Sequence, residues 1–356
     1  MASIEKATLI ASLKKVLPGV EKGATVIDGT DQLLFTGTTV SSYNGEIAVS
    51  APCDTQGLSF SVKGMDFYNL ASRMSDIMIS INVDGNKVKL KAGRTTASMV
   101  ILDSTKVSES VKALDLGGLE YKPLPNDFID DVRMCSLTGN VESLRGIAVG
   151  PYGDSSAIFE TDSNRICINL LSEAMDPFWV DDSTFNDALK VGNPDSYVVS
   201  GAWLHLKYAD GTVFSAKRKD HSAYPFDICA GFLKTIPTAK VIVKGCLPSN
   251  IAEAVSRVAI LAAGVDSKGA RLVELTFNKE ELGLYAEKVS GNASETIPWD
   301  SPLSEDPQGY KVWVDTAFLL EATNKAMDFI LCYVDGNPAL VFQSGNYTRL
   351  VSATAK

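Results

Sequence analysis

Paired carboxylates are the first residues in this sequence that could do chemistry. They are Asp130-Asp131, Asp181-Asp182 and Glu280-Glu281. Two neighbouring acids could serve as the general acid and base of a hydrolase. Each pair, however, falls at or near a predicted helix start or turn, and a helix N-terminus favours negative charge. Capping therefore explains the first two pairs best, and a carboxylate-dependent hydrolase stays as one alternative.

The histidines and cysteines show no spacing typical of a catalytic or metal site. His205 lies in the strand-like WLHLKY, and His221 follows the basic run 217–219. HExxH, GxSxG and GxxxxGK[ST] are absent. The cysteines form no CxxC pair, and most of them lie in apolar segments. We therefore expect buried free thiols in a reducing compartment. The six cysteines are Cys53, Cys135, Cys167, Cys229, Cys246 and Cys332. We expect no enzymatic activity, no metal and no cofactor.

Basic residues are placed more regularly than the acids. Every predicted helix carries at least one cation, and the set is Lys14, Lys15, Arg73, Arg133, Lys190, Arg257 and Lys325. Such cations are commonly found on solvated helix faces. If the helices turn to one side, the same cations can instead contact phosphates without reading bases.

The overall charge argues against nucleic-acid binding by bulk attraction. The 356 residues carry a formal net charge of −10. Residues 1–122 hold 13 basic and 13 acidic residues, whereas residues 123–238 hold 9 and 16. Any DNA contact therefore needs a local basic surface. Hydrophobic residues make up 45% of the chain, which is typical of a globular protein. No apolar run is long enough to cross a membrane, and the opening MASIEKATLIASLKK favours an amphipathic helix over a signal peptide.

An apolar triplet typical of one helix face recurs three times along the chain. Leu9, Leu13 and Val16 follow the spacing i, i+4, i+7. The other two triplets are Phe128, Val132, Cys135 and Ile251, Val255, Val258. Their starts are 119 and 123 residues apart. The near-constant interval predicts a repeated structural unit.

A second repeat is built around the tetrapeptide Val-Asp-Gly-Asn. Phe67 and Phe318 each lie 17 residues before its aspartate, Asp84 and Asp335. Asp-Gly between β-rich segments predicts a tight hairpin, since both central residues can take positive φ. Each unit therefore predicts helix, strand, turn, strand. The middle third has a looser copy, with a helix over 181–192 and a turn at 209–211.

The remaining segments alternate apolar and polar residues, as half-buried strands do. We predict an α+β fold in which each third has two helices packed on an antiparallel sheet. The proline-containing segments 119–126 and 234–240 are the expected junctions. The domains are predicted at 1–122, 123–238 and 239–356.

The ordered motifs resemble the bacterial DNA polymerase III β subunit, the sliding-clamp family. Residues 249–297 are similar to its third domain, with matches at Arg257, Ala259, Ile260, Leu261, Gly269, Arg271 and Leu272. LIASLKKVLPGV (9–20) resembles the opening helix of the family. LRGIAV (144–149), ETDSNRI (160–166) and YP (224–225) follow in the family's order. The departures from the family pattern indicate a divergent or phage-encoded member.

The resemblance implies a non-enzymatic processivity factor. Two three-domain subunits would join head to tail into a ring, with the helices lining the hole and the sheets outside. Such a homodimer encircles double-stranded DNA without sequence preference. The channel candidates are Lys14, Lys15, Lys22, Arg73, Arg133, Lys190, Arg257 and Lys325. The cytoplasm of a bacterial cell or of a phage-infected host is the expected location.

The resemblance also implies a pocket for short peptide motifs of a DNA polymerase and the clamp loader. An apolar groove with a few polar groups suits that task. The matching positions are Leu144, Thr161, Ser163, Asn164, Arg165, Ile166, Pro225 and Leu350. Core packing is an equal explanation for Leu144 and Ile166, whereas an arginine is hard to explain as a core residue.

Two departures mark where the resemblance is weakest. The chain ends in YTRLVSATAK, unlike the family's tail beside the pocket, and Ala97 replaces an aromatic of the dimer edge. The expected dimer-interface residues are Ala97, Met99, Ile260 and Leu261. A clamp-fold scaffold that does not encircle DNA stays as the second alternative, because residues 123–238 are strongly acidic.

Overall fold

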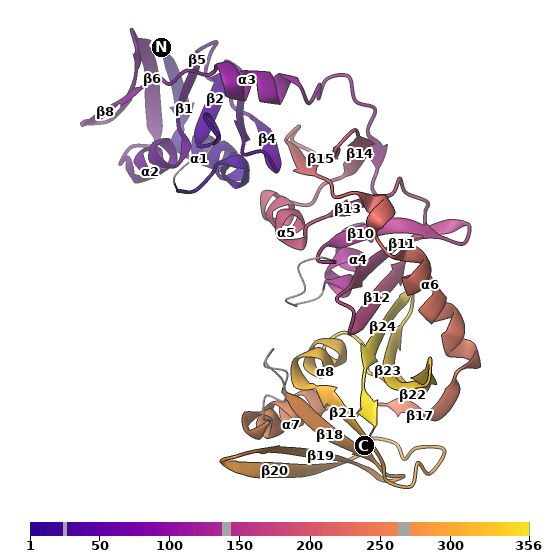
Figure 1. The fold of residues 1–356 in the computed structure, drawn as a ribbon. Helices are drawn as coiled ribbons and strands as arrows, with labels where there is room; N and C mark the ends of the chain where they lie inside the picture. The colour runs from indigo at the N-terminus through magenta and orange to yellow at the C-terminus, as the bar shows by residue number, and fades with distance from the viewer. Residues whose placement is uncertain (24–26, 137–143, 263–270, 356) are drawn as a thin grey trace. The chain divides into compact units, whose positions relative to one another are not determined.

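The computed structural model describes residues 1–23, 27–136, 144–262 and 271–355, and these form two compact units (Figure 1). Unit 1 consists of Met1–Leu124 and Phe178–Asp220. Unit 2 consists of Pro125–Pro177 and the chain from His221 onward. Helices and antiparallel sheets make up both units, which confirms the predicted fold class. The three-domain division stays a prediction, since residues 123–238 are shared between the two units.

Unit 1 contains two antiparallel sheets. The smaller has the order β1-β6-β7-β8, with bounds Ala2–Glu5, Met78–Asp84, Lys87–Ala92 and Thr95–Val100. The larger has the order β5-β2-β3-β4-β16-β15-β14-β9, with bounds Ser59–Lys63, Gln32–Thr36, Thr39–Tyr43, Ile47–Pro52, Val213–Lys217, Trp203–Lys207, Ser196–Ser200 and Lys122–Pro123. Strand β13 (Phe178–Val180) opens the second segment of the unit. The pairing of β4 with β16 joins segments far apart in sequence into one sheet.

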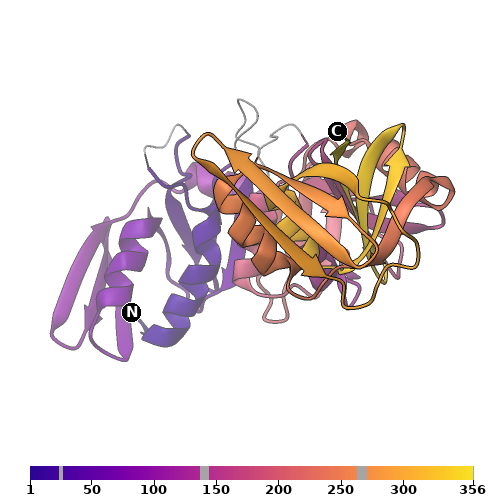
Figure 2. The ribbon, with the colours of Figure 1, turned by 90° about the horizontal axis from the view of Figure 1, so that it is seen from below.

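The helices of unit 1 pack on these sheets. Helices α1 and α2 lie side by side, as both views show (Figures 1 and 2). The helices are α1 (Lys6–Val16), α2 (Gly64–Arg73), α3 (Thr105–Lys112), α5 (Asp182–Val191) and the short η1 (Leu17–Gly19).

Unit 2 also contains two antiparallel sheets. The first runs β10-β11-β12-β24-β23-β22-β17, with bounds Ile147–Tyr152, Ser155–Thr161, Arg165–Leu170, Tyr347–Ser352, Asn337–Ser344, Asp328–Val334 and Lys240–Cys246. The second runs β20-β19-β18-β21-β25, with bounds Gly291–Pro298, Glu281–Lys288, Leu272–Phe277, Tyr310–Asp315 and Thr354–Ala355. The pairing of β12 with β24 is the junction at which the middle and last thirds of the sequence meet.

The helices of unit 2 cover these sheets. Helix α7 packs against β19 and β20 (Figure 2). The helices are α4 (Phe128–Cys135), α6 (Phe226–Thr235), α7 (Ile251–Val258), α8 (Thr316–Thr323) and the short η2 (His221–Ala223), η3 (Ile236–Thr238) and η4 (Ala259–Leu261).

The three predicted helix faces are confirmed. All nine apolar residues of the triplets are buried, in α1, α4 and α7. The prediction of two helices in each third was incomplete, because α3 and α6 were not foreseen. Helix α3 offers only two apolar residues, Val107 and Val111, and α6 is apolar on several sides, so its apolar residues do not single out one face.

Both Val-Asp-Gly-Asn hairpins form, each after a helix, but their registers differ by one residue. Val334 pairs with Asn337, so Asp335 and Gly336 form the turn, and both have positive φ. In the other hairpin Asp84 pairs with Lys87, so the turn is Gly85-Asn86 and only the glycine has positive φ. The hairpin at Asp84 therefore does not place its aspartate in the turn, contrary to the prediction.

Among the described residues, no helix is long and apolar enough to cross a membrane, and no cluster of His, Cys, Asp and Glu is arranged to hold a metal ion. All six cysteines are free thiols, as predicted. Five are buried and Cys246 is exposed.

Candidate functional site

An apolar cavity of about 570 Å³ lies within unit 2. Four segments form it: the β11–β12 turn, strand β24, the β22–β23 turn and helix α6. Seven of the eight predicted pocket residues line it, namely Leu144, Thr161, Ser163, Asn164, Ile166, Pro225 and Leu350. The sequence motifs chosen from distant parts of the chain therefore meet around one hollow.

Strand pairing explains why two of these motifs meet. Ile166 on β12 lies directly opposite Leu350 on β24. Opposite residues of an antiparallel pair point to the same face, and both of these line the cavity. The YTRL segment that departs from the family thus supplies part of the lining as β24.

The β11–β12 turn is shaped by its own side chains. The Asp162 Oδ1 atom accepts hydrogen bonds from the backbone N–H groups of Asn164, at 3.1 Å, and Arg165, at 2.9 Å. The Thr161 hydroxyl donates to the Arg165 carbonyl at 2.7 Å. Ser163 has φ 71°, a left-handed conformation. Asp and Thr stabilise such turns by bonding to the local backbone.

Arg165, the eighth predicted pocket residue, does not line the cavity. Its side chain has no exposed area, although we expected an arginine not to be a core residue. The guanidinium donates to the Asp162 carboxylate from Nε at 2.9 Å and Nη2 at 2.5 Å, and to Glu321 from Nη1 at 2.6 Å. It also lies 3.9 Å from the centre of the Phe318 ring. Two carboxylates and a ring face compensate the burial of this charge.

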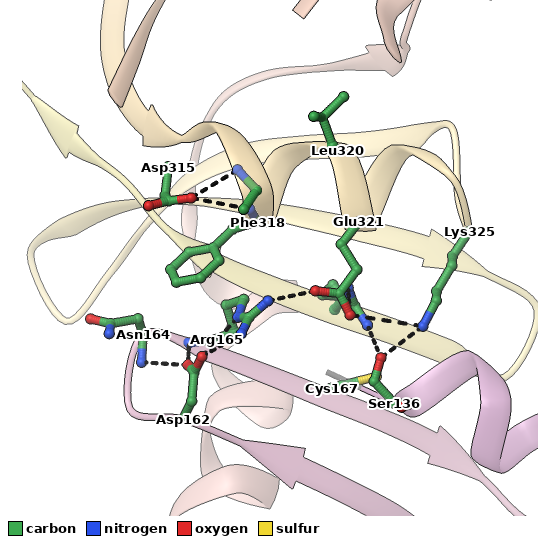
Figure 3. Close-up of polar contacts among 12 residues, drawn as sticks. Ser136, Asp162, Asn164, Arg165, Cys167, Asp315, Phe318, Leu320, Glu321 and Lys325 are labelled. Atoms are coloured by element: carbon green, nitrogen blue, oxygen red, sulfur yellow. Dashed lines mark hydrogen bonds and ion pairs between the residues drawn. The ribbon is translucent and has the colours of Figure 1, made fainter. Parts of the chain in front are cut away.

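Glu321 is the centre of a larger buried cluster (Figure 3). Its second oxygen lies 3.2 Å from Nη1 of Arg349, whose side chain is also fully buried. Lys325 donates to the carbonyls of Arg133, Met134 and Ser136, at 2.9–3.0 Å, where α4 ends. Burial lowers the pKa of Lys325. Helix α8, which carries Glu321, is capped by the Asp315 side chain.

Several lining residues were missed by the sequence reading. Ile228, Cys229 and Phe232 come from α6, and Val334, Asp335, Asn337, Pro338 and Ala339 come from the β22–β23 hairpin, with Ala223 and Ser352 beside them. The i, i+4 spacing of Ile228 and Phe232 was the available signal for α6. Ile228 is 64% exposed, so its side chain is open to a ligand of the cavity.

Four of the predicted channel cations form exposed or partly exposed ion pairs within their own unit. Lys15 pairs with Asp210, and the other three pairs are Arg133–Asp130, Lys190–Asp187 and Arg257–Glu295. Their side chains are partly or largely exposed. Exposed pairs of this kind contribute little to stability, so they can exchange partners easily.

The remaining four differ among themselves. Lys325 is committed to the end of α4, as described above. Lys14 on α1, Lys22 and Arg73 on α2 are exposed and form no ion pair with any residue that the structure describes.

The predicted interface residues lie at sheet edges or near them. Ala97 and Met99 are on β8, the edge strand of the smaller sheet of unit 1. Ile260, 70% exposed, and Leu261 are on η4, next to the edge strand β20 in unit 2. An edge strand presents unpaired backbone groups that a second chain can pair with.

The acids and the histidine considered for catalysis lie at helix N-termini or in the protein core. Asp130 and Asp131 lie in the first turn of α4, Asp182 lies in that of α5, and Asp181 is the N-cap of α5. His205 is buried, with Nδ1 2.8 Å from the Ser215 hydroxyl, and burial lowers its pKa to about 4. The acids thus lie where the helix dipole favours negative charge, although neither N-cap side chain forms a capping hydrogen bond.

Comparison with solved structures gives one consistent fold. A sliding clamp from Bacillus subtilis matches with a TM-score of 0.81 and 14% identity, covering 99% of this chain and 98% of that one. The Helicobacter pylori β clamp bound to a DNA ligase peptide matches with a TM-score of 0.80 and 15% identity over all of both chains. A Pseudomonas aeruginosa sliding clamp gives 0.78 and 15%, covering 100% of this chain and 99% of that one. No family model and no curated protein matches the sequence. The chain therefore has the sliding-clamp fold over its full length.

Proposed function

We propose that this protein is a DNA sliding clamp, a processivity factor that encircles duplex DNA and tethers a polymerase to it. The observation that carries the proposal is the clamp fold over 98–100% of both compared chains, together with the apolar cavity of unit 2. A ring on DNA needs no catalytic group. It works through topology, and we propose no enzymatic activity.

The DNA contacts we propose are weak and directed at phosphates. Lys14, Lys22 and Arg73 offer exposed cations. Lys15, Arg133, Lys190 and Arg257 can exchange an exposed carboxylate for a phosphate at little cost. We no longer place Lys325 in the channel, since three carbonyls hold its ammonium group. Contacts of this kind permit sliding because they carry no sequence information.

We propose that two copies join head to tail into the ring. The edge strand β8, with Ala97 and Met99, would meet the region of Ile260 and Leu261 of a second copy. Ile260 is 70% exposed and lies beside the edge strand β20, so it is available for such a contact.

We propose that the cavity of unit 2 captures short peptide motifs of a polymerase and a clamp loader. The H. pylori clamp of the same fold is bound to a DNA ligase peptide. The cavity lining is mainly apolar, with a few polar groups such as Thr161 and Asn164, which suits an extended peptide with apolar anchors. The DNA ligase peptide of that complex, called the ligase peptide below, is the probe we choose. The cytoplasm of a bacterial cell or of a phage-infected host is the proposed place of action.

The alternative is a clamp-fold scaffold that does not encircle DNA. The acidic balance of residues 123–238 favours it, because a like-charged channel wall repels phosphates. The sliding-clamp hypothesis and the scaffold hypothesis both include the peptide cavity, so only an assay of DNA encirclement distinguishes them.

Threading onto DNA is the test. Linear duplex with biotin at both ends is incubated with the protein, streptavidin then blocks the ends, and the mixture is gel-filtered at high salt. A clamp stays with the DNA and is released when a restriction enzyme cuts between the ends. Streptavidin added before the protein is the control, and it should prevent retention. Retention that does not depend on the order of addition, or no retention, contradicts the proposal.

A further inference from the structure

The buried charge cluster and the apolar cavity lie on opposite faces of the same pair of strands. Cys167 on β12 is opposite Arg349 on β24, so alternation puts Arg165, Cys167 and Arg349 on one face. Ile166 and Leu350 are then on the other face, where they line the cavity. Whatever fixes the two arginines therefore also fixes the cavity wall.

Asp162 connects the cluster to the rim of the cavity. One of its oxygens accepts from the backbone of the β11–β12 turn, and the other holds the Arg165 guanidinium at 2.9 Å. The turn residues Thr161, Ser163 and Asn164 are cavity-lining. The Asn164 carbonyl accepts from the Ser352 N–H at 2.9 Å, which ties the turn to the end of β24.

Glu321 reaches both strands from helix α8 (Figure 3). Its carboxylate accepts a hydrogen bond from Arg165 of β12 through one oxygen, and its other oxygen forms an ion pair with Arg349 of β24 at 3.2 Å, without hydrogen-bond geometry. It is 12% exposed, so water competes weakly for it. Charged groups with this little exposure hold a narrow geometry, because moving apart leaves an unpaired buried charge.

We propose that Glu321 is the positioning residue of the peptide cavity, holding the shape of the β11–β12 turn and its place beside the end of β24 through Arg165 and Arg349. Glu321 does not touch the cavity itself. The inference rests on the proposed peptide-binding function for its ligand, an extended peptide with apolar anchors. In this proposal helix α8, which packs on the sheet face opposite the cavity, contributes to peptide binding through Glu321.

The test compares Glu321→Gln with Glu274→Gln. Glu274 is also a buried carboxylate of unit 2, paired with Lys311 at 2.7 Å, but it lies outside the cavity segments. Binding of the ligase peptide is measured by fluorescence anisotropy on the folded full chain. We expect Glu321→Gln to weaken binding about ten-fold and Glu274→Gln to leave it unchanged. A merely structural role predicts equal, small effects of both.

The double variant Glu321→Gln/Arg349→Gln covers the case in which the single variant does not fold. It removes one charge of each sign, so the Arg165–Asp162 pair stays balanced while the bridge between the strands is lost. The same weakening of about ten-fold is expected. Affinity within two-fold of the natural chain, in either folded variant, overturns the proposal.

Amide hydrogen exchange separates this inference from the proposed function. If Glu321 positions the turn, the N–H groups of Asn164, Arg165 and Ser352 exchange faster in the Glu321 variants than in Glu274→Gln, with no peptide present. Failure of the natural chain to bind the ligase peptide, with this exchange pattern intact, contradicts the peptide pocket and leaves the positioning role standing. Unchanged exchange refutes the positioning role whether or not the peptide binds.

Discussion

The two units each contain a junction at which strands distant in sequence pair, and the junctions are built from different chemistry. In unit 1, β4 pairs with β16, and each of these strands carries a neutral polar group that bonds to its other neighbour: Ser50 of β4 accepts from Ser41 of β3 at 3.0 Å, and Ser215 of β16 lies 2.8 Å from His205 of β15. In unit 2, β12 pairs with β24, and the buried groups are the charged Arg165, Arg349 and Glu321.

This difference indicates different tasks. Small hydroxyl groups satisfy their hydrogen bonds locally and hold strands together at modest cost. Buried charges add little net stability, yet they fix geometry because any displacement leaves a charge unpaired. The charged junction is the one that also forms a wall of the peptide cavity. We therefore regard the β4–β16 junction as structural and the β12–β24 junction as positioned for binding.

The largest expected effect is the loss of Glu321. Glu321→Ala removes the carboxylate that pairs with Arg349 and one of the described carboxylates that hold Arg165. We expect unit 2 to lose about 3–5 kcal/mol of unfolding free energy. In unit 1, Ser215→Ala should cost about 1 kcal/mol. Urea unfolding followed by circular dichroism measures both, and equal losses would remove the distinction between the junctions.

The neutral junction should be sensitive to acid through His205. Burial lowers its folded-state pKa to about 4, from an ordinary value of 6.5. The unfolded chain thus binds more protons between these values, so stability falls as pH drops from 6.5 to about 4. The loss amounts to roughly 3 kcal/mol at most. His205→Gln should flatten this dependence, and an unchanged pH profile in that variant contradicts the assignment.

Removing an apolar anchor of the cavity should act on binding alone. Phe232→Ala on α6 takes away a lining ring that is half-buried, so the fold should persist. We expect the ligase peptide to bind about ten-fold more weakly or worse, from a loss of about 1.5–3 kcal/mol of apolar contact. Val241→Ala, an exposed apolar residue outside the lining, is the matched control. Equal affinity in the two variants argues against this cavity as the binding site.

The smallest effect is expected for a surface ion pair of unit 1. Lys15→Ala breaks the ion pair with Asp210. The Lys15 side chain is 28% exposed and the Asp210 side chain is 44% exposed. The unfolding free energy should change by less than about 1 kcal/mol, and the difference should shrink further at high salt. Lys14→Ala, next to it and free of an ion pair among the described residues, is the comparison. If Lys15→Ala lowers the unfolding free energy about as much as Glu321→Ala does, the predicted order of effects is wrong.

Local patterns could be predicted from the sequence because their causes are local. The triplet Leu9, Leu13, Val16 lies on one helix face by geometry alone, and the turn-forming residues of ETDSNRI shape the β11–β12 turn by their own hydrogen bonds. The two Val-Asp-Gly-Asn turns mark the limit, since the same four residues fold in two registers.

The role of Arg165 could not be predicted, because its partner Glu321 is 156 residues away in sequence. Alternation assigns Arg165 to a face of the sheet but does not say that a carboxylate and the Phe318 ring cover that face. Helix α6 was missed for a related reason. Its apolar side chains serve both the sheet and the open cavity, which removes the one-sided stripe typical of a surface helix.

Hydrogen exchange with and without the ligase peptide tests the contrast between the two junctions most directly. The account predicts protection on peptide binding at Thr161–Ile166, Val334–Ala339 and Leu350–Ser352, the segments that contribute lining residues to the cavity of unit 2. It predicts no change at Ile47–Ser50 and Val213–Ala216, the strands of the neutral junction. Protection at the neutral junction, or none around the cavity while the peptide is bound, would contradict it.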